Sequence, residues 1–233
     1  MGDSDPVAES AVAVQEVAKT TRSAIEATRD AGSFLAKYLD GPLVQMSGLL
    51  EDTLRYRRGV RLIRLEKRFQ EELQASGAKI DVKRLPVNFA LSALEEGSLE
   101  EDDDLQDLWA RLLANVADAG VAVSPRRAYI SMIKDLSPLD ALVFELIYSV
   151  PDVPLGKAIV TYQLPIRAFR ADGLDMADIL EPSKEIVLSL ANLERLGLLS
   201  HGSSWNGGEI FKFVNKTVPG RDFMKAIGRR SAI

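Results

Sequence analysis

Apolar side chains recur along most of this chain every three or four residues, the spacing of one face of an α-helix. The clearest run is Leu105, Leu108, Trp109, Leu112, Leu113 and Val116, and it predicts a buried core helix. Similar stripes predict helices at about 43–74, 86–94, 129–136, 139–147, 183–196 and 223–227. The pattern therefore indicates a mainly helical fold.

Polar residues that favour helix starts precede several of these stripes. Ser98 with Glu101 resembles a capping box, and Asp102 to Asp104 would place negative charge at the positive end of the helix dipole. Ser124-Pro125 and Ser137-Pro138 each combine a capping serine with a proline at the first helical position. These signals predict helices that begin close to positions 98, 124 and 137.

Residues 7–39 form a different pattern, a seam of mostly small residues at alternating steps of four and three. This spacing is typical of a helix that packs against another helix, as in a coiled coil. Small side chains bury little apolar surface, so the segment is expected to need a partner for stability. The partner is either a second protein, including another copy of this chain, or the chain's own body. Attachment to a membrane surface is disfavoured because large apolar residues are sparse.

The pattern changes after Tyr148, where prolines at 151, 154 and 165 predict irregular structure. A short helix at 174–180 and a longer one at 183–196, ended by Gly197, are expected next. Strands at 198–201 and 209–214 flank a turn sequence. This order of elements is that of a winged helix. We therefore divide the chain into a helical N-terminal arm (1–49), a helical core (50–137) and a small α+β winged-helix-like domain (138–233).

Composition supports an ordinary soluble protein. Hydrophobic residues make up 46% and charged residues 27% of the 233 positions, with a net charge of -5. The absence of cysteine excludes disulfides, thiol catalysis and cysteine-ligated metals. An acidic N-terminus is unlike a signal peptide, and the longest apolar stretch, ten residues at 41–50, is shorter than the roughly 20 that cross a bilayer. We expect a cytoplasmic protein without a transmembrane segment.

Residue types that carry chemistry are scarce. His201 is the single histidine and falls at a predicted strand end, and the acids from Glu95 to Asp107 are explained by helix capping. Glycine-rich nucleotide motifs, the nucleophile-elbow pattern and metal-binding helix motifs are all missing from the sequence. We expect no enzymatic activity, no cofactor, no metal site and no small-molecule substrate.

Cations gather on one helix face between positions 55 and 68. Arg57, Arg61, Arg64 and Arg68 follow the spacing i, i+4, i+7 and i+11. The first three have no acid three or four residues away, so their counter-charges lie elsewhere. The acidic turn at 100–104, bulk solvent, and an anionic partner (protein, nucleic acid or phospholipid) are the alternatives.

The wing-like loop carries Trp205 among glycines, a residue type that anchors many protein contacts. It either contacts a partner or folds back on its own domain.

The helix at 183–196 balances two cations with two acids, and residues 151–233 contain 11 Lys or Arg against 9 Asp or Glu. That charge is modest for a protein that binds phosphates. Protein binding is thus favoured over DNA reading, in which Asn192 could contact adenine.

Several segments taken together resemble the abortive-infection alpha family of bacterial proteins. They are the arginine-rich helix before Leu85-Pro86-Val87, LWARLLAN (108–115), YISMIKDLSPLD (129–140), NLERLGL (192–198) and GRDFMKAI (220–227). The resemblance implies a role in defence against phage, in which infected cells stop supporting viral growth. It carries no catalytic residues over to this sequence.

The expected function is that of a non-enzymatic phage-defence protein acting through protein contacts, as sensor, adaptor or regulator. It would bind a protein partner or its own copy through the N-terminal arm. The second hypothesis is a winged-helix transcription regulator, and the third is an enzyme whose site has no recognisable motif.

Overall fold

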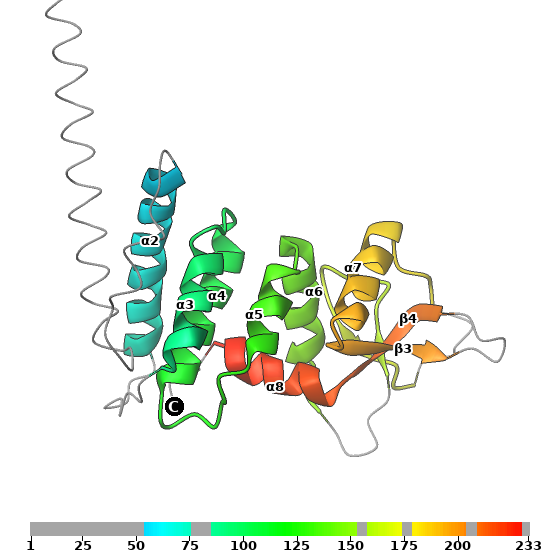
Figure 1. The fold of residues 1–233 in the computed structure, drawn as a ribbon. Helices are drawn as coiled ribbons and strands as arrows, with labels where there is room; N and C mark the ends of the chain where they lie inside the picture. Colours follow the sequence, from blue (N-terminus) through cyan, green and yellow to red (C-terminus); the bar gives the residue numbers. More distant parts are fainter. Residues whose placement is uncertain (1–53, 76–84, 153–157, 174–178, 204–208, 230–233) are drawn as a thin grey trace, which may run out of the picture.

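The computed structural model describes residues 54–75, 85–152, 158–173, 179–203 and 209–229. The expected arm at 1–49 lies outside these residues. The helices are α2 (Leu54–Ala75), α3 (Val87–Gly97), α4 (Asp103–Ala117), α5 (Arg127–Lys134), α6 (Pro138–Ser149), α7 (Lys184–Arg195) and α8 (Val218–Ile227). The strands are β1 (Ile159–Val160), β2 (Phe169–Arg170), β3 (Leu199–Ser203) and β4 (Glu209–Lys216). The fold is thus mainly helical with a small sheet, as the pattern predicted (Figure 1).

Helix α4 is the centre of the helical part. All six members of the run predicted from 105 to 116 are buried, and α2, α3 and α5 pack around them. Helix α2 contributes Leu65, Phe69 and Leu73, which are also buried. On α3 the apolar spacing predicts a buried face of Val87, Ala90, Leu91 and Leu94, whereas Phe89 and Ala93 are buried and Leu91 is only partly so.

Two of the predicted helix starts are wrong. Asp102, and not Ser98, caps α4: its carboxylate accepts hydrogen bonds from the backbone amides of Asp104 and Leu105, each 3.0 Å long. Ser98 instead ends α3 and donates its hydroxyl to the carbonyl of Glu95. Helix α5 begins at Arg127 without a side-chain cap, three residues after Ser124. Glu101, three residues after Ser98, and Pro125, directly after Ser124, made these two serines look like helix caps in the sequence.

The third start signal is confirmed. Ser137 accepts a hydrogen bond from the amide of Asp140, and the Asp140 carboxylate accepts one from the amide of Ser137, which together form a capping box at α6. The apolar stripe of α6 predicts that Leu142 faces inward, and this prediction is wrong. Leu142 is 46% exposed, while Phe144 takes a fully buried place.

The sheet has the order β2-β1-β4-β3 and all its neighbours are antiparallel. The hairpin of β3 and β4 confirms the two predicted strands. Strands β1 and β2 occupy the stretch that prolines had suggested to be irregular, and each is only two residues long. The short helix expected at 174–180 falls mostly outside the described residues.

Helix α7 begins and ends where the sequence indicated. Ser183 caps its first turn, and Gly197 adopts a φ of 73° after its last residue. The amides of Gly197 and Leu198 then donate to the carbonyls of Glu194 and Leu193. This pair of bonds is the Schellman arrangement, which favours glycine because a side chain is strained at positive φ.

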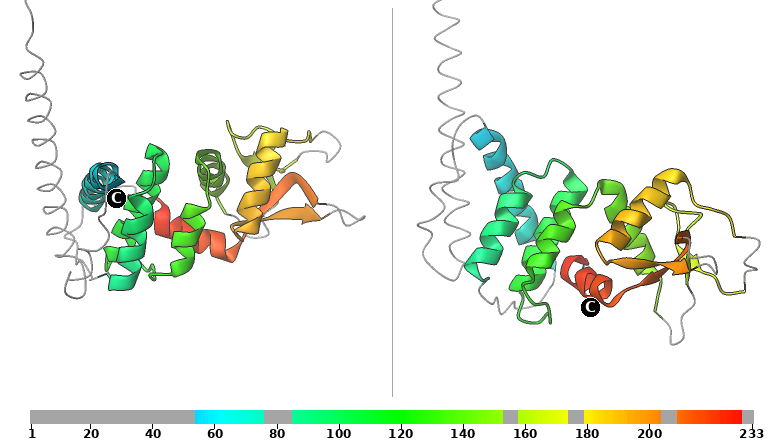
Figure 2. Two further views of the ribbon diagram at one scale, coloured as in Figure 1. Left: turned by 45° about the horizontal axis from the view of Figure 1, so that its top comes forward. Right: turned by 45° about the vertical axis from the view of Figure 1, so that its right-hand side comes forward.

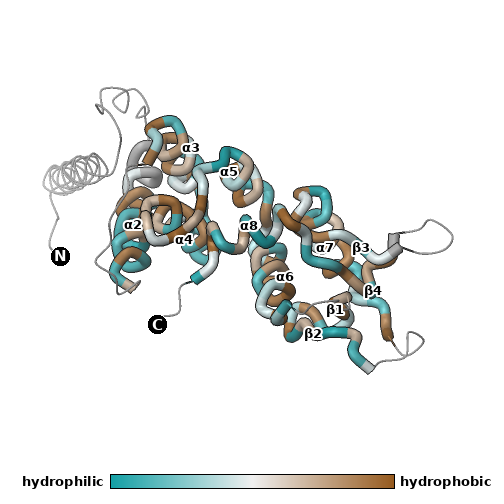
Figure 3. The backbone as a smooth tube through the Cα atoms, turned by 90° about the horizontal axis from the view of Figure 1, so that it is seen from below, coloured by the Kyte–Doolittle hydropathy of each residue, from teal (hydrophilic) through white to brown (hydrophobic). Residues whose placement is uncertain are grey.

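Helix α8 crosses the helices α4, α5 and α6 and joins the two ends of the molecule (Figures 1 and 2). Seen from below, it lies between α4 on one side and α6 on the other (Figure 3). The buried Asn115 amide on α4 donates to the carbonyls of Ala226 and Gly228, at 2.9 and 3.1 Å. The apolar core accordingly runs without interruption from Leu65 on α2 to Ile227 on α8.

The start of α8 fits closely against the end of α6. A Cβ added to Gly220 would lie 1.8 Å from the Tyr148 hydroxyl and 2.2 Å from the Leu198 carbonyl oxygen. The Tyr148 hydroxyl itself donates to the Leu198 carbonyl at 2.6 Å and accepts from the amide of Thr217 at 3.2 Å. Position 220 therefore requires glycine, because its backbone lies directly against the Leu198 backbone and the Tyr148 phenol.

Candidate functional site

The arginine face of α2 lies against the acidic turn at the start of α4. Arg61 pairs with the Glu101 carboxylate and donates to the Leu99 carbonyl at 3.1 Å. Arg68 contacts the carboxylates of Asp103 at 2.8 Å and Asp107 at 2.7 Å. Internal pairing, one of the alternatives left open by the sequence, thus accounts for both side chains.

The other two arginines of this face are less constrained. Arg64 is 59% exposed and its closest acid oxygen, on Asp103, is 3.8 Å away. A pair of this kind contributes little, because solvent screens it. Arg57 lies within α2, and its side chain is outside the described part of the structure. Among the described members of the face, Arg64 therefore offers the most accessible guanidinium to a partner.

Beside this face lies a buried cation that sequence reasoning missed. Arg111 on α4 is 4% exposed, and its guanidinium approaches Glu145 on α6 at 2.6 Å, Glu72 on α2 at 3.7 Å and Asp107 at 4.0 Å. It also reaches the carbonyl of Ile227 at 3.5 Å. The signal available in the sequence was a single charge between Leu108 and Leu112 in an otherwise apolar stripe. Arg111 joins α2, α4, α6 and the end of α8.

A second polar junction connects α7 to the turn between α5 and α6. The Asn192 amide donates to the Asp135 carbonyl at 2.9 Å and to the Asp140 carboxylate at 3.0 Å, while its oxygen accepts from Arg195. Arg195 also pairs with the Asp135 carboxylate at 3.0 Å. The amide that could have contacted adenine is therefore engaged inside the protein.

A third junction holds α5 to α8. The Tyr129 hydroxyl donates to the Asp222 carboxylate at 2.5 Å, and Arg126 pairs with the same carboxylate at 3.3 Å. Burial, followed by the hydrogen bond and the charge of Asp222, raises the pKa of Tyr129 to about 12. The rings of Tyr129 and Phe223 lie 5.8 Å apart, centre to centre. The phenol thus stays neutral and donates at any physiological pH.

His201 has a carboxylate partner. Its Nδ1 lies 2.5 Å from Oε1 of Glu194, and its backbone amide donates to the same oxygen at 3.3 Å. A histidine oriented by a carboxylate is the base half of a catalytic triad, but it needs a nucleophile and a binding cleft as well. The hollow described next is lined by other residues.

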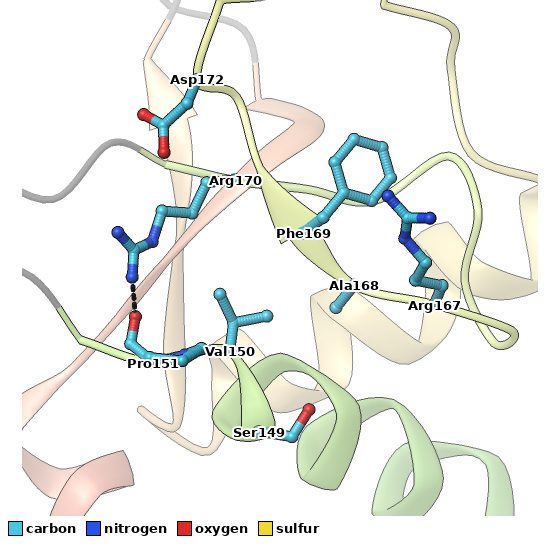
Figure 4. A pocket seen from close by; sticks show the side chains of 8 residues that line it. All are labelled: Ser149, Val150, Pro151, Arg167, Ala168, Phe169, Arg170 and Asp172. Carbon is cyan, nitrogen blue, oxygen red and sulfur yellow. Dashed lines mark hydrogen bonds between the residues drawn. The ribbon is translucent and has the colours of Figure 1, made fainter.

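One hollow of about 630 Å³ lies between the end of α6 and β2. Its lining residues come from two segments, 149–151 and 167–172, and include Arg167, Phe169 and Arg170 (Figure 4).

In the described ranges, no group of three His, Asp or Glu side chains could hold a metal ion. No helix of those ranges combines the length and apolar character that a membrane span requires.

The segments joined by these polar junctions are those on which the resemblance to a known family rests in the sequence. Residues 57–231 match the family described as abortive infection alpha, and the match covers most of the chain. The chain belongs to that family. No curated protein matched, and no solved structure matched either.

The segments that carry the resemblance lie at the three junctions. LWARLLAN supplies Arg111 and Asn115, and YISMIKDLSPLD supplies Tyr129, Asp135 and Asp140. Their counterparts come from the motifs NLERLGL and GRDFMKAI, which provide Asn192, Arg195 and Asp222. In this abortive infection alpha protein the motifs therefore fix the arrangement of helices, and they do not converge on one reactive site.

The solvent-facing side of α7 combines charge with an exposed apolar residue. Leu188, in the middle of the helix, is 63% exposed, and Lys184, Glu185 and Arg195 are exposed on the same helix. Leu180, just before α7, is 64% exposed. The expected contact residue Trp205 falls outside the described residues. Sequence reasoning, which placed Val187, Leu190 and Leu193 inward, did not single out Leu188.

Proposed function

We propose that this member of the abortive infection alpha family is a non-enzymatic, cytoplasmic phage-defence protein that acts through protein contacts. Membership of the family supports the defence role. The polar side chains singled out by the sequence support the absence of catalysis, because most of them serve as internal joints between helices. A metal-dependent nuclease or nucleotidase activity that disappears on neutralising Asp102, Asp103 and Asp104 would contradict this proposal.

We further propose that residues 138–227 form a winged helix. Helix α6, strands β1 and β2, helix α7 and the β3–β4 hairpin follow one another, and β4 lies between β1 and β3 in the sheet. In a winged helix, the helix before the hairpin is the one that DNA-reading members insert into the major groove. Helix α7 holds that place here, so the residues on its outer side bear on the choice between DNA and protein.

The exposed Leu188 carries the proposal. A groove-reading helix presents donors to base edges and cations to phosphates, whereas the outer side of α7 presents a leucine at its centre. Asn192, its best base-reading candidate, is engaged with Asp135 and Asp140. Exposed apolar residues rimmed by charge are typical of protein contact surfaces. The outer side of α7 therefore suits a protein partner better than DNA.

The test replaces Leu188 with aspartate in cells challenged with phage. We expect Leu188→Asp to abolish protection, because a charge at the centre of a contact surface has to be desolvated on binding. Val218→Asp is a matched control, since Val218 is 79% exposed and lies on α8. Equal melting temperatures would show that neither change affects the fold. Full protection by the Leu188→Asp protein would overturn the assignment of α7 as the contact surface.

The alternative, a DNA-binding regulator, has its own test. Gel-shift measurements with genomic fragments at low and moderate salt should show no sequence-specific complex. Non-specific binding through phosphates would fall steeply as salt rises. A specific complex that persists at moderate salt would favour the regulator.

The N-terminal arm is proposed to mediate association, on the evidence of its seam of small residues. Deleting residues 1–40 should lower the molar mass of the particle measured by light scattering, if the arm joins copies of this chain. An unchanged mass, with a full-length protein already monomeric, would contradict self-association.

A further inference from the structure

Exposed cations gather where α5 starts beside α8, at the lower edge of the molecule in Figure 1. We call these four side chains the basic end: Arg126, Arg127, Arg221 and Lys225. The two helices meet at Asp222 on α8, whose carboxylate contacts Arg126 at 3.3 Å and the Tyr129 hydroxyl at 2.5 Å. Lys225 follows Asp222 by about one helical turn, so the four cations belong to one corner of the protein.

Acids neutralise only half of the basic end. Asp222 and Asp152 each pair with one of its arginines. Arg127 and Lys225 form no ion pair within the described ranges. The loop before α5 adds no negative charge, because residues 119–125 contain no acid. Four cations less two acids leave an excess of two positive charges.

The other end of the same helices is acidic. We call residues 95–104, around the end of α3 and the start of α4, the acidic end; they include seven Asp or Glu. Four cations pair with these acids: Arg61, Arg64, Arg68 and Lys134. Seven acids less four cations leave an excess of three negative charges. Glu95 and Asp104 form no ion pair with any described residue.

The length of α4 and α5 separates the two ends. Lys134 at the end of α5 pairs with Glu96 at 2.7 Å, whereas Arg126, just before α5, contacts α8. Helix α4 has 15 residues and is therefore about 22 Å long. Figure 1 accordingly shows the turn between α3 and α4 at the edge opposite to α8. The basic end therefore cannot reach the acidic end of its own chain, but it can reach that of another copy.

We propose that the basic end docks onto the acidic end of a second copy of this chain. Arg127 and Lys225 would then acquire the counter-charges that they lack, and so would Glu95 and Asp104. The contact joins two different surfaces, so it is heterologous and leaves each pair of copies with one free end of either charge. Further copies can add in the same way, and the product is an open chain of molecules.

A second copy fits the basic end better than a nucleic acid does. The chain has a net charge of -5, which repels a phosphate backbone, and half of the cations of the basic end are already paired. In the acidic end, Leu99 is 41% exposed among the carboxylates. An exposed apolar residue rimmed by charge is typical of protein contacts. The inference goes beyond the proposed function, because it uses neither the outer side of α7 nor the N-terminal arm.

Light scattering on the full chain tests the contact. The average molar mass should rise with protein concentration at low salt and fall when salt is added, because exposed charges are then screened. Arg127→Glu should weaken association about tenfold or more, since like charges would meet. Lys184→Glu is the matched control: Lys184 is also the exposed, unpaired first residue of a helix, α7. Equal masses of the two variants would overturn the proposal, and association through the arm alone would give that result.

Mixing two variants shows whether the contact joins opposite ends. Glu95→Lys, near the end of α3 where a cation suits the helix dipole, disables the acidic end as Arg127→Glu disables the basic end. Neither variant should associate alone, but an equimolar mixture should, because the acidic end of one meets the basic end of the other. A mixture no larger than its components would contradict a head-to-tail contact. So would a complex with a DNA duplex that Arg127→Glu abolishes, if the protein without DNA is monomeric.

Discussion

The guanidinium of Arg111 lies 2.6 Å from the carboxylate of Glu145, although Arg111 is almost fully buried on α4 and Glu145 belongs to α6. Removing one partner of a buried pair costs about 3–5 kcal/mol when the other charge stays buried. The carboxylates around Arg111 are partly exposed, so we expect Arg111→Ala to lower the free energy of unfolding by about 2–4 kcal/mol. Urea titration measures it. Arg111→Met, which refills the volume, should recover part of the loss; wild-type stability of Arg111→Met would show that the charge contributes nothing.

The pairing between Arg68 and Asp103 can be tested by reversing both charges. We expect Arg68→Glu to destabilise the protein by about 1–2 kcal/mol, because its carboxylate would meet Asp103 and Asp107 across α2 and α4. Combining it with Asp103→Arg should restore part of that stability. A double-mutant cycle in urea gives the coupling energy, and a coupling of zero would mean that the ion pair between Arg68 and Asp103 does not stabilise the packing of α2 on α4.

Tyr129 should make stability depend on pH at the alkaline end. Its pKa is raised from 10.0 to about 12 in the folded protein, so the folded state keeps a proton that the unfolded chain loses. The resulting stabilisation is complete below pH 10 and is lost as the pH rises toward 12, by up to about 2 kcal/mol. Tyr129→Phe should be less stable than the parent at pH 9, with the gap closing by pH 12. A constant gap would contradict the assignment.

Gly220 should tolerate no side chain. We expect Gly220→Ala to destabilise the protein by at least about 3 kcal/mol, because its Cβ would overlap both the Tyr148 hydroxyl and the Leu198 carbonyl. Adding Tyr148→Phe removes the first of these obstacles and should restore only part of the stability. Thermal unfolding of the single and double variants provides the comparison, and a wild-type melting temperature for Gly220→Ala would disprove the close approach.

Helices with an uninterrupted apolar stripe could be predicted from the sequence, because burial of such a stripe depends mainly on its period. The stripe of α4 and the capping box of Ser137 are examples. The prediction that Ser98 caps α4 was wrong because the spacing of a serine and an acid alone cannot distinguish the end of one helix from the start of the next. The prediction for Leu142 was wrong because periodicity does not state how wide the covered part of a helix is.

Strands β1 and β2 could not be predicted because two residues carry no usable period. Strand β1 forms through pairing with residues of β4 that follow it by more than fifty positions, and β2 in turn pairs with β1. Part of the candidate site could not be predicted for a similar reason. The arginine face and its acids were visible as patterns, but the burial of Arg111 and the hollow beside Arg167 depend on contacts between distant segments.

The position of α8 has a consequence for how the protein is made. Asn115 bonds to Ala226, a residue 111 positions later, so α4 acquires this partner only near the end of synthesis. Contacts of such long range must overcome the entropy of closing a large loop, and they slow folding. Until α8 docks, α4 and α6 both expose apolar surface to the cell, and an emerging chain in that state invites chaperones or proteases. Chains interrupted before α8 would be recognised as incomplete and removed.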